Sequence, residues 1–177
     1  MGEDIRVVNA SLVIEFEECD KRYDEFKKEY DSLSEYEEDS IGQWLKLAKA
    51  KGETKESDQV LLTLMVELHR KVDELTSIVK NEEREFIKLK NISRIEAIGY
   101  EHFRLEKEAF EVSKEYYGRI AMPVFPKRDI PLFFKAVAKN MAKITLMHEK
   151  DTKDWSAYVV ARERVMIREL KQRSSSV

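Results

Sequence analysis

The chain of 177 residues is 42% hydrophobic and 38% charged, with a formal net charge of −3 at pH 7. These proportions indicate a soluble, folded chain of one or two small domains. It contains no run of about 18 apolar residues of the kind that spans a membrane. The first ten residues lack the basic and apolar regions of a signal peptide, so we expect a cytoplasmic protein without membrane insertion.

Charge is distributed unevenly along the chain. Residues 1–40 carry fourteen acidic and five basic side chains, whereas residues 113–177 carry fourteen basic and seven acidic ones. The formal net charges of the two segments are therefore −9 and +7. Two segments of opposite net charge favour contacts between parts of one chain or between copies of it, although solvated surface charge is the commoner explanation.

The first predicted element is a long helix from Val8 to Leu33. Apolar residues recur there at spacings of three and four, as on one face of a helix. The stripe consists of Val8, Leu12, Phe16, Cys19, Tyr23, Phe26, Tyr30 and Leu33. Acidic side chains occupy the other faces. We therefore expect residues 1–56 to form an acidic helical region, completed by a short helix over 41–51 that ends at Gly52 in the left-handed conformation.

Residues 57–82 are predicted to form a long amphipathic helix with Ser57 as its N-cap. Its apolar residues alternate between spacings of four and three, which is typical of a coiled-coil seam. The stripe consists of Leu61, Met65, Leu68, Val72, Leu75 and Val79. Neighbouring leucines widen the stripe beyond what one small domain would cover, so we predict a homo-oligomer that associates through it. Alternatively, the N-terminal helices fold back on the stripe within one chain.

After residue 84 the apolar pattern changes from helical to alternating, which predicts about five short strands. The predicted strands lie at 86–98, 103–105, 116–125, 132–140 and 142–148. All three prolines fall between 123 and 131, which indicates a rigid link between strands. A final helix, capped by Asp151 or Thr152, would cover one end of this antiparallel sheet. The predicted fold class is α+β, with helices first, then strands, then one helix.

The segment IEAIGYEHFRLEKEAFEVSKEYYGRIAMPVFPKRDIPLFFKAVAK contains a strand that ends in glycine, an F-x-V-x-x-x-Y-x-G-R pattern and a proline-bounded link. In this order, followed by KDWSAYVVARERVMIREL, these pieces resemble a PilZ domain, the small bacterial β-barrel that serves as a receptor for cyclic di-GMP. The resemblance covers roughly residues 84–173 and implies a barrel domain over residues 84–177 that is closed by the C-terminal helix. The helix over 57–82 resembles the oligomerising helices of atypical, tetrameric PilZ proteins.

The nucleotide motif of that family is not intact in this sequence. The family pattern has two arginines as R-x-x-x-R before the barrel and then D/N-x-S-x-x-G on a strand. Upstream of Asn91, no two arginines are four residues apart. Counting back from Gly99 places Arg94 where the family has Asp or Asn, and Glu96 where it has Ser, and a carboxylate there would repel a phosphate.

Arginine can fork onto a phosphate or a guanine edge, so four of the remaining arginines are candidates for ligand binding, together with the glycine of the strand motif. The candidates are Arg94, Gly99, Arg119, Arg164 and Arg168. Arg164 and Arg168 form the R-x-x-x-R of this chain, but they lie on the final helix, where a solvated face is the simplest interpretation.

The resemblance implies a non-enzymatic signalling adaptor that works in cyclic di-GMP pathways, motility among them, through protein contacts. Two alternatives stay open. One is a cyclic di-GMP receptor with a non-standard site, and the other is a structural helical scaffold with a docking barrel. Cyclic di-GMP is the one ligand that the resemblance implies; we expect no other cofactor.

An enzyme, a metal protein and a nucleic-acid-binding protein are all poorly supported by the sequence. It contains no G-x-x-x-x-G-K-[ST], G-x-S-x-G or H-E-x-x-H motif, and its three histidines lie far apart. Its single cysteine, Cys19, excludes an internal disulfide and is predicted to be a buried thiol. The chain as a whole is acidic, so we expect no nucleic-acid partner.

Overall fold

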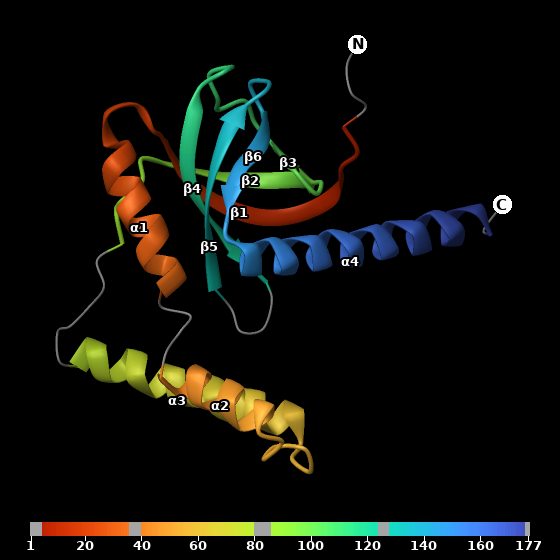
Figure 1. Cartoon of the computed structure of the whole chain (residues 1–177). Helices are drawn as coiled ribbons and strands as arrows, with labels where there is room; N and C mark the ends of the chain where they lie inside the picture. The colour runs from red at the N-terminus through yellow and green to blue at the C-terminus, as the bar shows by residue number, and fades with distance from the viewer. Residues whose placement is uncertain (1–4, 36–39, 80–85, 124–127, 176–177) are drawn as a thin grey trace. The chain divides into compact units, whose positions relative to one another are not determined.

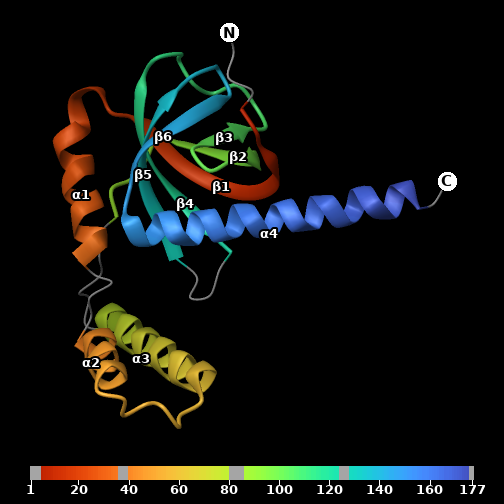
Figure 2. The same cartoon turned by 45° about the vertical axis from the view of Figure 1, so that its right-hand side comes forward.

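The computed structural model describes residues 5–35, 40–79, 86–123 and 128–175. The chain divides into two units, one formed by Met1–Tyr30 with Lys88–Val177 and the other by Asp31–Ile87. The first unit is a β-barrel with two helices against its outside, and the second is a pair of helices (Figures 1 and 2). The fold class is α+β, as predicted.

Six antiparallel strands close the barrel in the order β1-β2-β3-β6-β5-β4 (Figure 1). Their bounds are Val8–Glu18 (β1), Asn91–Ile98 (β2), His102–Leu105 (β3), Glu115–Met122 (β4), Arg128–Ala136 (β5) and Met141–Met147 (β6). The antiparallel strands and the C-terminal helix expected after residue 84 are confirmed. The strand predicted from residue 86 begins only at Asn91, and Pro131, expected in the link, lies within β5. The rest of that link, at 124–127, falls outside the described residues.

The prediction of one helix from Val8 to Leu33 is wrong. Residues 8–18 form strand β1, a short 3-10 turn follows at Asp20–Arg22, and helix α1 covers only Tyr23–Glu35. The barrel therefore takes its first strand from the region expected to be entirely helical. Apolar residues at a spacing of four lie on one face of a strand as well as of a helix, and Ala10 and Ile14 complete an alternation of period two.

The barrel interior is filled by apolar side chains from all six strands. Phe16, Phe103, Phe110 and Phe134 lie at its centre with ring centroids 5.0–6.3 Å apart and mostly edge to face, an arrangement that aromatic quadrupoles favour. Inward residues of β1 alternate with outward ones along most of the strand. This alternation is what makes the outer face of β1 available for polar groups.

Helix α1 lies along the outside of the barrel beside β4 and β5 (Figures 1 and 2). Phe26 stacks on Tyr117 of β4 with ring centroids 5.1 Å apart, and Tyr30 contacts Phe133 of β5 edge to face at 5.5 Å. Phe26 and Tyr117 are fully buried. The aromatic contacts hold the first two turns of α1 in place and bring its acidic side chains to the barrel surface.

Helix α4, Glu149–Ser174, runs along the barrel and continues past it (Figure 1). Its Trp155 is fully buried and donates a hydrogen bond from Nε1 to the carbonyl of Gly99, 2.9 Å away. The predicted caps are wrong: His148 occupies the N-cap position, and no side-chain cap is present there. Asp151 is instead buried, and its Oδ1 forms an ion pair with Nη2 of Arg128 at 2.8 Å. This ion pair connects the helix to β5.

The second unit contains helices α2, Ser40–Ala50, and α3, Gln59–Val79, which lie side by side (Figure 2). Gly52, two residues after the end of α2, has a φ of 77°, which is the left-handed conformation that was predicted. The N-cap of α3 is Asp58 and not Ser57, because Oδ1 of Asp58 accepts hydrogen bonds from the amides of Val60 and Leu61.

Candidate functional site

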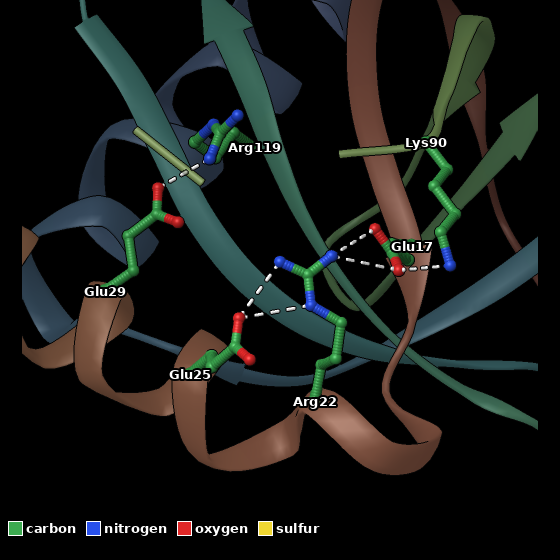
Figure 3. Close-up of polar contacts among 6 residues, drawn as sticks. All are labelled: Glu17, Arg22, Glu25, Glu29, Lys90 and Arg119. Carbon is green, nitrogen blue, oxygen red and sulfur yellow. Dashed lines mark hydrogen bonds and ion pairs between the residues drawn. The ribbon is translucent and has the colours of Figure 1, made fainter. Parts of the chain in front are cut away.

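The outer surface of β1 and β4 carries a buried ionic cluster under helix α1 (Figure 3). Arg119 of β4, only 6% exposed, donates from Nη1 to Glu29 of α1 at 2.5 Å and from Nη2 to Glu15 of β1 at 2.8 Å. Strand pairing explains the second contact, since Glu15 lies directly opposite Arg119 in the β1–β4 register. One guanidinium therefore joins two strands and a helix.

A second group of ion pairs extends the cluster along β1 (Figure 3). The buried carboxylate of Glu17 accepts two hydrogen bonds from Nη1 of Arg22, at 3.2 and 3.0 Å, and pairs with Nζ of Lys90 at 2.9 Å. Arg22 also donates to Glu25 at 3.1 and 3.0 Å, and its guanidinium lies over the ring of Phe26. Charged groups at the start of α1 are thus fixed to the barrel wall.

The ion pairs of the cluster lower the pKa of a carboxyl group and raise the pKa of the buried guanidinium. Burial works against the charged form of Glu17, but hydrogen bonds from Lys90 and Arg22 outweigh it and hold the pKa of that carboxyl below its usual value. Burial likewise works against the charge of Arg119, yet Glu15 and Glu29 raise its pKa above the usual range. Burial, aided by the charge of Glu29, raises the pKa of Tyr117.

An open cleft of about 110 Å³ lies beside the ionic cluster on the same outer surface. It is lined by Val13, Glu15, Arg119, Ala121 and Asp129. These residues are neighbours because Val13 pairs with Ala121 across β1 and β4, and Ala121 pairs with Asp129 across β4 and β5. Apolar and carboxylate side chains thus share the cleft, with Arg119 held between its two carboxylates.

The predicted ligand-binding arginines do not converge on one point. Arg94 is exposed on β2, and β1 separates it from Arg119 on β4. Arg164 and Arg168 are exposed on α4, and the structure gives neither an ion pair with any residue that it describes. Arg119 is the one of the four whose guanidinium is buried, and two carboxylates already bind it.

Gly99 has a structural role at the turn between β2 and β3. A Cβ atom there would lie 2.6 Å from the carbonyl oxygen of Arg6, a separation that real side chains do not adopt. Its own amide donates to the carbonyl of His102, and its carbonyl accepts the indole N–H of Trp155. The glycine therefore allows the N-terminal segment, the turn and helix α4 to meet.

The apolar stripe of α3 is exposed along its whole length. Its six residues are between 52% and 82% exposed: Leu61, Met65, Leu68, Val72, Leu75 and Val79. Trp44 and Leu47 of α2 are exposed as well. Soluble monomers rarely expose a contiguous apolar surface of this kind, so the stripe is a second candidate site, for association with protein.

Among the described residues, Cys19, His69 and the possible metal ligands were the other candidates for a site. Cys19 is buried, as predicted, and burial raises the pKa of its thiol to about 12. Nδ1 of His69 lies 3.1 Å from Oδ2 of Asp73 on the surface of α3. Within the described ranges, no three His, Cys, Asp or Glu side chains are placed to hold a metal ion. In the same part of the chain, none of the helices is long and apolar enough to cross a membrane.

No family model, curated protein or solved structure matches this chain. The class that the fold itself defines is a closed six-stranded antiparallel barrel with a C-terminal helix and a separate helical pair.

Sequence reasoning missed the acidic residues of the ionic cluster, although the signal for two of them was present. Glu15 and Glu17 alternate with Ile14 and Phe16, which places both carboxylates on the outer face of a strand. Treating residues 8–18 as a helix hid that pattern. The position of Glu29 opposite Arg119 could not be found in this way, because it depends on how α1 lies against the barrel.

Proposed function

We propose that this protein is a non-enzymatic signalling adaptor of the atypical PilZ type, which acts in the cytoplasm in cyclic di-GMP-related pathways through protein contacts. Motility is one such pathway. The resemblance implies a closed antiparallel barrel followed by a helix. The observed barrel and C-terminal helix support the proposal, although strand β1 comes from residues 8–18, outside the segment that carries the resemblance. Fold agreement alone supports many functions, so the proposal depends on the sites.

The observation that carries the proposal is the state of the arginines around the barrel. A cyclic dinucleotide with two phosphates needs guanidinium groups that are accessible and close together. Arg119 is buried between two carboxylates, and Arg94, Arg164 and Arg168 lie apart on β2 and α4. This arrangement supports a barrel that has given up the standard nucleotide site and works by contacting protein.

The exposed stripe of α3 supports homo-oligomerisation as part of this function. Its alternate spacing of three and four suits coiled-coil pairing with a second copy, in which each apolar residue fits between four residues of the facing helix. The wide exposure of Leu68 and Val79 indicates that neither α2 nor the rest of their own unit covers the stripe.

Isothermal titration of the full-length chain with cyclic di-GMP tests the adaptor proposal. We expect no saturable heat at micromolar nucleotide, together with a light-scattering mass of at least two chains. Saturable binding would favour the alternative, a receptor with a non-standard site, which charge reversal at Arg94, Arg119 or Arg164 would then locate. A clean monomer at micromolar concentration would overturn the oligomer.

A further inference from the structure

The outer barrel surface beside α1 has a regular arrangement of residues. Strand register places Arg94, Val13, Ala121 and Asp129 in one row across β2, β1, β4 and β5. The adjacent row runs through Ile92, Glu15, Arg119 and Pro131. The cleft lies between the two rows at the β1–β4–β5 end, lined by residues from three strands.

The charge of the cleft favours a cation. Of the lining residues, Glu15 is ion-paired with Arg119, which also binds Glu29 of α1 outside the cleft. Asp129 is the second carboxylate of the lining, is exposed, and makes no ion pair with the residues that the structure describes. Two carboxylates and one guanidinium give the lining a net charge of −1, which favours a cation over a phosphate.

The apolar lining indicates which kind of cation fits. Val13 is 44% exposed on one side of the cleft, and Ala121 on the next strand forms its apolar neighbour. A long basic side chain covers apolar surface with its methylene stem while its charged end reaches a carboxylate. A cleft of about 110 Å³ accommodates the end of one such side chain but not a nucleotide or an aromatic amino-acid side chain together with its backbone.

We propose that this cleft binds a basic side chain of a protein partner, arginine in preference to lysine. The guanidinium would donate to Asp129 and to the solvent-facing part of the Glu15 carboxylate, because a planar fork can bond two acceptors at once. Its stem would lie on Val13 and Ala121, and the exposed Ile92 would extend the contact at the rim. The inference rests on the proposed adaptor function and names the chemistry of the partner segment.

The test is an NMR titration of the isotope-labelled full-length protein with N-acetyl-arginine amide. We expect saturable, millimolar binding, with amide shifts concentrated at Val13, Ala121 and Asp129. The citrulline analogue has the same shape without the charge and should give no comparable shifts. Shifts that are absent from these strands, equal for citrulline, or produced there by inorganic phosphate would overturn the proposal.

Variants separate the cleft from general surface charge. Asp129→Asn should weaken arginine binding about fivefold, as expected for loss of one exposed ion pair. Ala121→Leu should abolish binding by filling the cleft without changing its charge. Glu106→Gln, an exposed carboxylate at the end of β3, is the matched control and should leave binding unchanged. Equal loss in Glu106→Gln and Asp129→Asn would refute the site.

The subunit mass and the cyclic di-GMP titration, measured on the same samples, keep this inference distinct from the proposed function. Absent arginine binding with an unchanged oligomer refutes the cleft alone. A monomeric mass, or saturable binding of cyclic di-GMP, refutes the adaptor proposal alone if the amide shifts caused by the arginine probe are still observed.

Discussion

The barrel and the helical pair use apolar residues in opposite ways. In the barrel, Ile14, Phe16 and Ile120 are at most 1% exposed, because a sheet closed on itself encloses the side chains of its inner face. In the helical pair, Leu68 and Leu75 are more than 60% exposed, because two helices have no interior large enough for a stripe that runs the length of α3. A closed sheet therefore buries its apolar residues within one unit, whereas the helix pair leaves a long apolar stripe exposed.

Leu68→Asp, in the helical pair, should have the largest effect of the substitutions considered. A charge in the centre of the α3 stripe should dissociate the oligomer to a monomer, since burying an unpaired carboxylate costs several kcal/mol, on the order of 3–5. Light scattering and sedimentation measure the mass. Thr63→Asp, which adds the same charge on another face of α3, should keep the oligomer intact. Unfolding of the helical unit without a change in subunit number would instead indicate that the stripe is covered within one chain.

Phe16→Ala tests the barrel side of the comparison. Removal of the ring that contacts Phe110 and Phe134 should lower the free energy of unfolding by about 3–5 kcal/mol. Denaturant unfolding followed by circular dichroism measures it. Val13→Ala, on the outer face of the same strand, should change stability by less than about 1 kcal/mol.

Glu17→Gln sharpens the role of charge where α1 meets the barrel. Loss of the carboxylate that binds Arg22 and Lys90 should cost about 1–2 kcal/mol at neutral pH, a value moderated by the exposure of both cations. The folded pKa of Glu17 lies below the ordinary value of 4.5, so its contribution is complete above that pH and disappears as the pH falls through the folded value. Unfolding curves of the two proteins should therefore converge in acid. A gap that persists at the lowest pH would contradict the assignment.

Cys19 should give the smallest effect. Because its thiol is buried and its pKa is raised to about 12, a disulfide reagent at pH 8 should label it only after denaturation. The reaction is measured by the absorbance of the thiol that the reagent releases. The denatured protein serves as the reference for complete labelling. Fast labelling of the native protein would show that the end of β1 opens readily.

Prediction from sequence succeeded where one periodicity was possible. Phe103 and Leu105 alternate with polar residues and form β3, and the spacing of residues 61–79 forms α3. It failed at residues 8–18, where Val8, Leu12 and Phe16 satisfy both a helical and an alternating pattern. The alternating residues between them indicate a strand. However, strand β1 pairs with β2 and β4, which lie about eighty residues or more further along the chain, so no local pattern reveals its partners.

The candidate sites divide in the same way. The α3 stripe could be named residue by residue from the sequence, because it is a property of one helix. The ionic cluster and the cleft could not, because Glu15, Glu29 and Arg119 come from three elements that only the closed barrel and the position of α1 bring together.

By itself, the sequence determined the α+β class, an amphipathic helix predicted over 57–82 and observed over 59–79, strands after residue 84 and a buried cysteine. Each of these follows from local spacing and composition. Only the tertiary structure decided that residues 8–18 complete a barrel and that Arg119 is held between two carboxylates. Strand pairing and buried ion pairs join residues about a hundred positions apart, and no local pattern records such a distance.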